Sequence, residues 1–450
     1  MDPRMPNDEP EAAAGPVESN IQSIDINPRD WWNSMDENWK KVFRNAINIY
    51  DDPDTDQLEQ MLNTEYVYLY VDQQQVEGIT NLNPLKYLKK VKQISGIGST
   101  KATDLSPIAN LVTLTYLDLS SAKCTSIDAL KNLVNLDSLY LGSSKVTDIS
   151  PISGLIRLKN LYLGYSRIKD ISPIANLVNL ENLELANLKI KDLSLLSKLS
   201  KLSYLNLSYT KIKDISFVAN MKRLTTLYLA YTRVSDLTPL SNLVHLDTLD
   251  LSGTRISDIE PLKNLRRLNN LYLTNTDIED LSPLQDLVYL RSLYIGQTMV
   301  EDISPISVLN LENLDISNTG ITNLEPLRNI TSLRYLYAGQ TDITSIAPLK
   351  DCYMLDYLSL NDTPIKNLDG IQSLEGLKTL DISNTLVSDL SPLSSMIGLQ
   401  SIYASNSSIT SIKPIMDLPL TTFYCYGCPI PSEEIQEFRD RNPNCYIDQY

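Results

Sequence analysis

Histidine is nearly absent from this chain of 450 residues, which contains only His245. Because one imidazole cannot build a histidine-based catalytic dyad or a site with several histidine ligands, both are practically excluded. The sequence contains no glycine-rich phosphate loop and no nucleophile elbow. No run of 18 or more apolar residues occurs, so no transmembrane helix is predicted. We therefore expect a protein that is not an enzyme and that has no cofactor and no metal site.

Positive charge and cysteine are also scarce. Lysine and arginine total 39 against 55 acidic residues, a net charge of −16. This balance argues against nucleic acid as the main partner, because phosphate binding needs a positive surface. Of the five cysteines, Cys124, Cys352 and Cys425 occupy apolar slots of a repeat and are predicted to be core thiols. Cys428 and Cys445 either form a disulfide, which an oxidising compartment would maintain, or remain free.

A repeat of about 22 residues dominates the sequence. Its shared text is roughly LxxLxLxxTxIxDIsPLxxLxx, and consecutive copies begin 22 residues apart except for two steps of 21. The fifteen copies begin at Leu114, Leu136, Leu158, Leu180, Leu202, Leu224, Leu246, Leu268, Leu290, Leu311, Leu333, Leu355, Leu377, Leu399 and Leu420. This period and leucine pattern are typical of a leucine-rich-repeat solenoid.

The copy that begins at Leu158 shows how one repeat would fold. Leu161 and Leu163 alternate with polar neighbours, as in a strand with one buried face, so Tyr162 should point outward. Apolar residues then recur every three positions around Ser172-Pro173, which suits a short helical turn with serine capping and proline at its first position. We predict an α/β solenoid: a leucine-rich-repeat horseshoe with a parallel concave sheet and short 3-10 or helical turns on its convex side.

The two ends of the repeat array read as caps. We predict a disordered acidic spacer at residues 1–25, a helical cap at 26–75, the solenoid at 76–424 and a short cap at 425–450. Ser34 and Glu37 resemble a capping box that starts a helix. Trp31, Trp32 and Trp39 are expected to pack in this cap, with ligand anchoring as the alternative. A second helix from about Thr55, an irregular strand at 66–71 and a C-terminal helix from Ser432 complete these ends.

The outward strand positions are rich in tyrosine. Eight of the fifteen residues between the second and third leucines are tyrosine. Tyrosine is enriched in binding surfaces because it offers a rigid apolar body with a polar tip. Stacking that only stabilises the sheet is the alternative. The predicted ligand-binding residues of the concave face are Tyr140, Tyr162, Tyr165, Tyr204, Tyr228, Tyr231, Asp250, Tyr272, Tyr294, Asp315, Tyr337 and Tyr357.

Two charged patterns accompany the tyrosines. Acids recur in the same column at every third repeat, either because a block was duplicated or because they match a periodic ligand. A secondary basic stripe follows the strands at Lys123, Lys145, Arg167, Lys189, Lys211, Arg233 and Arg255. An acid stands three residues later in most repeats, as at Asp192, Asp214 and Asp236. These two rows could relieve each other's repulsion and the acids could cap the next turn, or the basic stripe could dock an acidic partner.

The repeat text, with turns such as DISPI and DLTPL after strands such as LYLG and LDLS, resembles bacterial internalins and internalin-like proteins. The resemblance covers about 330 residues. It implies secretion or surface display, and a role in partner binding for the tyrosines at 140, 162, 228, 272, 294 and 337. Threonine mostly replaces the family's asparagine in the repeat turn, as at Thr210, Thr232 and Thr254. No signal peptide, immunoglobulin-like module or cell-wall sorting signal is visible.

We therefore expect a monomeric, noncatalytic recognition protein that binds a protein ligand through the tyrosine-rich face. The alternatives are glycan binding and an intracellular scaffold, since the repeat length also resembles that of eukaryotic phosphatase regulatory subunits. The internalin resemblance favours a secreted or cell-surface location, with the cytoplasm as the alternative.

Overall fold

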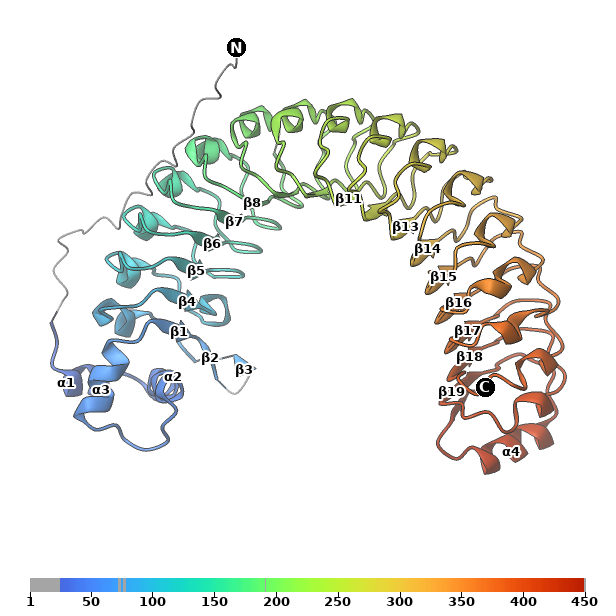
Figure 1. Cartoon of the computed structure of the whole chain (residues 1–450). Helices are drawn as coiled ribbons and strands as arrows, with labels where there is room; N and C mark the ends of the chain where they lie inside the picture. Colours follow the sequence, from blue (N-terminus) through green and yellow to red (C-terminus); the bar gives the residue numbers. More distant parts are fainter. Residues whose placement is uncertain (1–24, 72–73, 76–77, 191, 449–450) are drawn as a thin grey trace, which may run out of the picture. The chain divides into compact units, whose positions relative to one another are not determined.

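The computed structural model describes residues 25–71, 74–75, 78–190 and 192–448 of the chain. The chain divides into two compact units, one up to Leu183 and the other from Glu184 onward. Each unit taken by itself is a stack of coils, with short parallel strands on the inner side and 3-10 turns on the outer side (Figure 1). The predicted solenoid is thus confirmed. Residues 1–24 of the predicted spacer lie outside the described residues.

The first unit contains a parallel sheet in which each strand pairs with the next coil. Its strands are β1 (Tyr66–Tyr68), β4 (Gln93–Ser95), β5 (Tyr116–Asp118), β6 (Ser138–Tyr140) and β7 (Asn160–Tyr162), paired in that order. A separate antiparallel pair joins β2 (Tyr70–Val71) and β3 (Gln74–Gln75). Residues 78–111, whose apolar positions fit the repeat poorly, still build a coil: Ile94 of β4 is paired with Leu117 of β5, and both side chains are buried.

The second unit continues the same pattern. The division of the chain falls within β8 (Asn182–Glu184). The later strands are β9 (Tyr204–Asn206), β10 (Thr226–Tyr228), β11 (Thr248–Asp250), β12 (Asn270–Tyr272), β13 (Ser292–Tyr294), β14 (Asn313–Asp315), β15 (Tyr335–Tyr337), β16 (Tyr357–Ser359), β17 (Thr379–Asp381), β18 (Ser401–Tyr403), β19 (Thr422–Tyr424) and β20 (Tyr446–Asp448). Within this unit each strand from β9 to β19 pairs in parallel with its successor. The strand β20, beyond the last repeat, was not predicted.

The register explains which side chains form the core. Leu227, Leu249 and Leu271, the central residues of β10, β11 and β12, are aligned with one another and have no exposed surface. Since successive strand residues point to opposite faces, the first and third residues of each strand face away from the core. The predicted phase of the coil, with aliphatic side chains inside and tyrosines outside, is therefore correct.

Several of the 3-10 turns start at a Ser-Pro or Thr-Pro pair, as predicted, but the serine does not cap them. In the turn Ser172–Asn176, proline occupies one of the first two positions and no side chain caps the residue before Ser172. Instead, Asp170 accepts a hydrogen bond of 2.8 Å from the Ser172 backbone N–H. An aspartate two residues before the turn repeats this contact in the next six coils, which confirms the predicted capping by the acidic row. In some other coils Asn323 or Ser345 accepts the bond instead.

In many coils a threonine hydroxyl forms a hydrogen bond within the turn that follows the strand. The buried Thr254 donates its hydroxyl to the Leu251 carbonyl oxygen at 2.5 Å, and Thr232 bonds Leu229 in the same way. The same bond recurs at Thr210, Thr276, Thr298, Thr319, Thr341, Thr363 and Thr385. In these coils a threonine hydroxyl therefore closes the turn within its own coil, at the position where internalin-like repeats commonly have asparagine. In the first unit the equivalent Ser144 and Ser166 hydroxyls are buried without a hydrogen-bond partner.

The N-terminal cap has three helices, α1 (Pro28–Asn33), α2 (Glu37–Ile47) and α3 (Thr55–Leu62), of which α1 was not predicted. The predicted capping box of Ser34 is wrong. Ser34 lies at the end of α1, and Asp36 caps α2 by accepting from the Trp39 N–H. An aspartate directly before Glu37 was a sufficient cap, so the earlier serine was free to end α1.

The three tryptophans pack in this cap as predicted. Their side chains are buried, and Trp31 and Trp39 lie 4.8 and 5.7 Å from the Phe43 ring. Each indole N–H has an acceptor, on Pro84, Asp52 and Asn81 respectively. These contacts account for the rings without a ligand.

At the other end, α4 (Ser432–Arg441) covers the last coil, and Phe438 packs 5.7 Å from Phe423 of β19. Both rings are fully buried, as the predicted role of this helix requires. Within the described parts of the chain, no helix has the combination of length and apolar character that crossing a membrane demands.

Candidate binding surfaces

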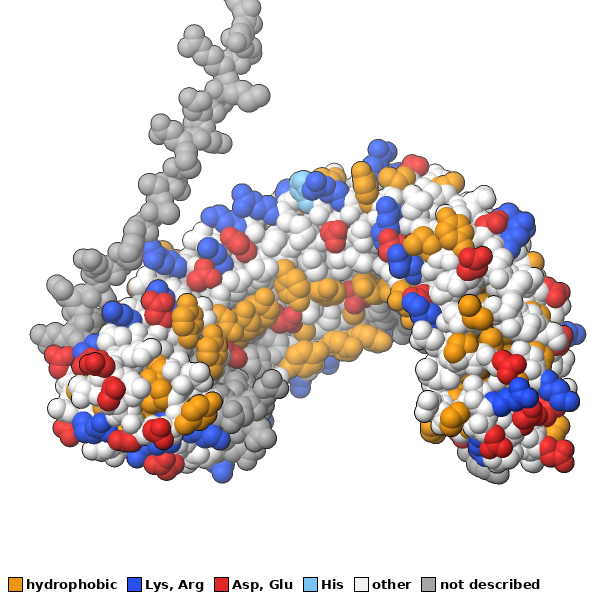
Figure 2. All heavy atoms as spheres, turned by 60° about the horizontal axis from the view of Figure 1, so that its bottom comes forward, with side chains coloured by type: hydrophobic (Ala, Val, Ile, Leu, Met, Phe, Trp, Pro, Cys, Tyr) orange, Lys and Arg blue, Asp and Glu red, His pale blue; other side chains and the backbone are white. Residues whose placement is uncertain are grey.

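The outward side chains of the strands form the first candidate surface, here called the sheet face. It consists of the first and third residues of β1 and of β4 to β20. The tyrosines predicted as ligand-binding within strands all lie on it, namely Tyr140, Tyr162, Tyr204, Tyr228, Tyr272, Tyr294, Tyr337 and Tyr357, together with Asp250 and Asp315. Most of these side chains are partly exposed. Figure 2 shows rows of side chains of the hydrophobic class, which there includes tyrosine, on the inner face with separate acidic groups among them.

The sheet-face tyrosines are stacked on their neighbours. Tyr140 and Tyr162 lie 4.5 Å apart between ring centroids at an interplanar angle of 6°, and Tyr272 and Tyr294 lie 4.7 Å apart at 8°. Other neighbouring pairs are tilted, such as Tyr337 and Tyr357 at 37°. The stacking alternative is thus realised in the geometry. It is compatible with binding, because a ring fixed by its neighbour loses little further freedom when a partner arrives.

The phenols of Tyr140 and Tyr272 on the sheet face hold their protons more tightly than a free tyrosine does. Burial, together with Tyr162, Tyr116 and Asp118, raises the pKa of Tyr140 to about 12. Burial first and the Asp250 carboxylate second raise the pKa of Tyr272. Each hydroxyl therefore remains a hydrogen-bond donor beside carboxylate acceptors.

The acids that recur at every third repeat cap their own strands. Asp250 accepts a hydrogen bond of 2.9 Å from the Ser252 N–H, and Asp315 accepts one of 2.9 Å from Ser317. Glu184 does the same for Ala186 and also accepts from Tyr204 and Asn206. Burial raises the pKa of Glu184, and these three hydrogen bonds oppose the rise. A local structural task thus accompanies each recurring acid.

The sheet face carries no positive charge. At the outward positions of the described strands, the only ionisable side chains besides tyrosine are Asp118, Glu184, Asp250, Asp315, Asp381 and Asp448. Lysine and arginine do not occur there. The face consequently combines aromatic rings, hydroxyl donors and carboxylates, which is complementary to a surface that presents cations and amides.

The second candidate surface lies just beyond the strands, where each turn has one residue with a left-handed backbone. Elsewhere in the second unit this slot holds residues such as Asn187 and Asn275, but Tyr209 and Tyr231 occupy it with φ of 60° and 56°. Both rings are about half exposed, at 51% each. In the first unit Tyr165 is equivalent, with φ of 60°. Tyr165 and Tyr231, predicted as part of the concave face, therefore lie at its edge and not in the strands.

The basic stripe follows two residues after this slot. Its seven residues, Lys123, Lys145, Arg167, Lys189, Lys211, Arg233 and Arg255, are all exposed. Within the described parts of the chain, none of them pairs with the acidic row three residues later, whose carboxylates bind backbone N–H groups instead. The two rows thus form no direct ion pairs with each other, and the capping role of the aspartates is confirmed. The predicted relief of repulsion between the rows stays a prediction.

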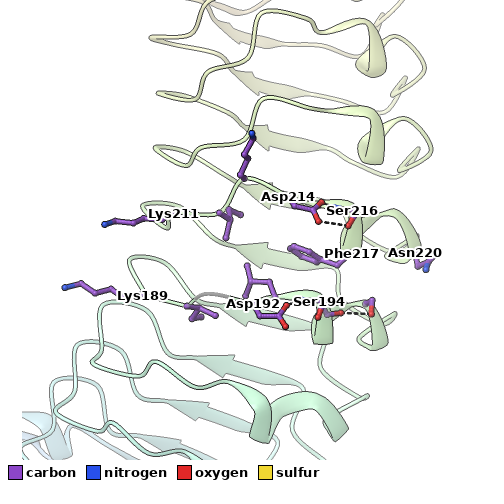
Figure 3. Close-up of a pocket in the computed structure, with 13 residues that line it drawn as sticks. Lys189, Asp192, Ser194, Lys211, Asp214, Ser216, Phe217 and Asn220 are labelled. Carbon is purple, nitrogen blue, oxygen red and sulfur yellow. Dashed lines mark hydrogen bonds between the residues drawn. The ribbon is translucent and has the colours of Figure 1, made fainter.

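A pocket of about 820 Å³ opens between two coils of the second unit. Figure 3 shows Phe217 and the capping residues Asp192 and Asp214 within it, while Lys189 and Lys211 extend away from it. Ile190 and Ile212 in its wall are 8% and 9% exposed, whereas the equivalent residues of most other coils are fully buried. The sequence contained a signal for this opening, since Leu195 and Phe217 stand where most repeats have proline.

The cysteines divide as their slots predicted, but without a disulfide. Cys124, Cys352 and Cys425 are buried thiols, and burial raises the pKa of each. Cys428 and Cys445 are also free. The Cys428 sulfur lies 3.0 Å from the Ala404 carbonyl oxygen, and the Cys445 sulfur is turned towards the Tyr446 carbonyl oxygen, so the two thiols serve different neighbours. No cluster of three or more metal-ligating side chains exists in the described ranges.

Comparison with known proteins agrees with this architecture. The family description "Leucine Rich repeats (2 copies)" matches residues 112–154, 134–176, 178–220, 222–264 and 354–395. No curated protein sequence matches the chain. An internalin (InlF) from Listeria monocytogenes is 30% identical, with 84% of this chain and 96% of that chain covered and a TM-score of 0.56.

Two further solved structures share the fold. A leucine-rich-repeat protein from Leptospira interrogans is 22% identical, with 82% of this chain and 93% of that chain covered and a TM-score of 0.65. The ectodomain of the Arabidopsis receptor kinase HAESA, solved in complex with a peptide hormone, is 18% identical over 85% of this chain and 69% of that chain, with a TM-score of 0.65. The repeat pattern, the parallel sheet and the identity to InlF over nearly its whole length lead to one conclusion: the chain belongs to the internalin-like leucine-rich-repeat proteins.

Proposed function

We propose that this protein is a noncatalytic recognition protein whose sheet face binds a protein ligand with basic side chains at the contact. The observation that carries the proposal is the combination of stacked, partly exposed tyrosines with carboxylates and no cations at the outward strand positions. Arginine and lysine of a partner would find ring faces or edges, phenol oxygens and carboxylates within one surface.

The geometry favours a protein over a small molecule. Tyr228, Tyr272 and Tyr294 lie on β10, β12 and β13, with Asp250 of β11 between the first two, so the surface extends along the coils at roughly 4.8 Å per strand. An extended, shallow surface with rigid aromatic anchors is the usual form of a protein interface, whereas small ligands need a closed pocket. The HAESA ectodomain, which has the same fold, was solved with a peptide hormone, which is consistent with this role.

Glycan binding receives less support from the same rings. Sugar rings stack on free aromatic faces, but the faces of Tyr272 and Tyr294 are turned towards each other at 4.7 Å. One face of each ring is therefore occupied by the other ring. A glycan array with the wild-type protein tests this alternative, and strong binding that the tyrosine variant below loses would favour a glycan ligand.

The direct test is affinity capture from bacterial and host-cell extracts with immobilised protein. The variant replaces Tyr228, Tyr272 and Tyr294 by alanine. We expect a specific protein retained by the wild type to be lost from the variant, with its affinity reduced at least about 100-fold for three removed anchors. Phenylalanine at the same three positions preserves the stacking and should retain part of the affinity.

Thermal unfolding separates binding from folding. If the alanine variant binds the captured protein as tightly as the wild type while its melting temperature falls, the tyrosines only stabilise the sheet. That outcome would refute the proposed function.

A further inference from the structure

We propose that the edge of the second unit is a separate docking surface for an acidic protein segment. This surface, here called the loop edge, consists of Tyr209, Tyr231 and Gly253 in the left-handed slot and of Lys189, Lys211, Arg233 and Arg255 beside them. It lies outside the sheet face and does not depend on the function proposed above.

The first observation is a pair of stacked tyrosine rings on residues whose backbone is left-handed. The Tyr209 and Tyr231 rings stack at 4.9 Å with an interplanar angle of 12°. Their φ values of 60° and 56° belong to a region that bulky residues rarely adopt, and the other coils of the second unit fill the slot with asparagine, glutamine, aspartate or glycine. Bulky residues held in such a conformation tend to occur at functional sites.

The second observation is the room made for this platform. Gly253 occupies the next slot with φ of 65°, and a Cβ atom added there would lie 2.5 Å from Cδ1 of Tyr231. The Tyr231 ring therefore lies directly over the glycine backbone. Tyr209, Tyr231 and Gly253 form one continuous stack across three coils, with about half of each ring open to solvent.

The third observation is charge. Lys189, Lys211, Arg233 and Arg255 are exposed on four consecutive coils, and no ion pair with another described residue engages their side chains. Backbones of adjacent coils are roughly 4.8 Å apart, so the four cations form a compact row. In a chain with a net charge of −16, such a row is a local reversal of sign that attracts anionic groups.

The chemistry of the surroundings favours a peptide over a nucleic acid. Asp192, Asp214, Asp236 and Asp258 follow each cation by three residues, and hydrogen bonds from the next turn lower the pKa of Asp192 and Asp236. The lowered pKa keeps the Asp192 and Asp236 carboxyl groups ionised, and these two negative charges would repel a continuous phosphate backbone. A peptide that places glutamate or aspartate opposite the cations and neutral residues between them avoids this repulsion, and its aromatic or proline residues can cover the tyrosine stack.

The test uses three labelled probes and the full chain. The first probe is a fluorescein-labelled peptide of about 8 residues, enough to cross the four coils in an extended form, with glutamate alternating with serine, proline and tyrosine. The second is the same peptide with glutamine for glutamate, and the third is single-stranded DNA of similar length. Fluorescence anisotropy gives the affinities at about 50 and about 300 mM salt.

The decisive variant is Lys211→Glu/Arg233→Glu, and its matched control is Lys222→Glu/Arg223→Glu. Both change one lysine and one arginine in the same unit, but Lys222 and Arg223 are exposed before β10, at the opposite end of the strands. We expect the first variant to weaken binding of the acidic peptide about tenfold or more and the control to leave it nearly unchanged. Equal loss in both variants, or equal binding of the glutamine peptide, would overturn the proposal.

The tyrosine stack is tested by Tyr209→Asn/Tyr231→Asn, since asparagine is the residue that the chain itself uses in this slot. We expect binding of the acidic peptide to fall several-fold while the melting temperature stays the same or rises, because asparagine adopts the left-handed conformation more easily. Undiminished binding, or tighter binding of the DNA than of the peptide, would show that this surface is not built for an acidic protein segment.

Discussion

The sheet face and the loop edge of the second unit use the same aromatic residue in opposite settings. On the sheet face Tyr272 and Tyr294 have an extended backbone, stack on each other and stand among carboxylates. On the loop edge Tyr209 and Tyr231 also stack, but their backbone is left-handed and their neighbours are unpaired cations. The comparison shows that residue type alone does not define a surface in a repeat protein. The position of the tyrosine within the repeat sets its backbone conformation and its charged neighbours, and these determine which kind of partner the surface can bind.

The core that both surfaces share should give the largest effect. Leu249 is the central residue of β11, and its side chain is fully buried in the core behind the sheet face. We expect Leu249→Ala to lower the free energy of unfolding by about 2–5 kcal/mol through lost burial and the cavity left behind. Chemical denaturation measures this change. A loss below that of the outward-facing Thr248→Ala would contradict the assignment of the core.

Replacing Gly253, the glycine beneath the Tyr231 ring, should destabilise the protein more than replacing a glycine in open space. We expect Gly253→Ala to lower the free energy of unfolding by about 1–2 kcal/mol, because alanine at φ of 65° is strained and its Cβ meets the Tyr231 ring. Gly154→Ala is the matched control, since nothing lies within 4 Å of the added atom and its φ is not positive. Equal melting temperatures for the two variants would show that the Tyr231 ring does not rest on Gly253.

The acidic and basic rows beside the loop edge should contribute unequally to stability. Asp214→Ala removes the acceptor of the Ser216 N–H and should lower the free energy of unfolding by about 1 kcal/mol, as for a lost cap. Lys211→Ala should change it by less than about 0.5 kcal/mol, because its side chain has no ion pair to lose. Urea denaturation of both variants checks this, and equal losses would support the idea that the rows stabilise each other.

Alkaline pH should lower the stability of the fold through the phenol of Tyr140 on the sheet face. The pKa of Tyr140 is raised from 10.0 to about 12, so the folded state holds its proton more tightly than the unfolded state. The corresponding stability is present below pH 10 and is lost as the pH rises from there towards 12. Tyr140→Phe should therefore reduce the fall of the melting temperature over this range. Identical pH profiles of the variant and the wild type would show that this phenol does not titrate as described.

The sequence predicted what the repeat itself enforces. Leucines at every second strand position all point to the same face, so only one assignment of the faces buries them. The core, the sheet face and the 3-10 turns therefore followed from the spacing of residues such as Leu161 and Ile168. The capping role of Asp170 was foreseen as one of two roles for its row. The helix α4 and the packing of Trp39 followed from apolar spacing next to a coil that must be covered.

Other features depend on tertiary geometry that the repeat text does not carry. Tyr209 and Tyr231 look like further members of a tyrosine row, and only the left-handed backbone separates them from the sheet face. The strand β20 has no leucine pattern and none of its residues is fully buried, so only its pairing with β19 reveals it. The cap at Asp36 competed with an equally good serine two residues earlier. The pocket beside Phe217 was marked by missing prolines, a deviation that becomes meaningful once the exposure of Ile212 is known.

The account rests most directly on the outward tyrosines of the sheet face meeting the partner. Hydroxyl-radical footprinting of the protein, free and with its captured partner, reads each tyrosine separately. Protection of Tyr228, Tyr272 and Tyr294 in the complex is the predicted result. If these three residues react equally in the free and the bound protein, the partner binds elsewhere and the proposed role of the sheet face is wrong.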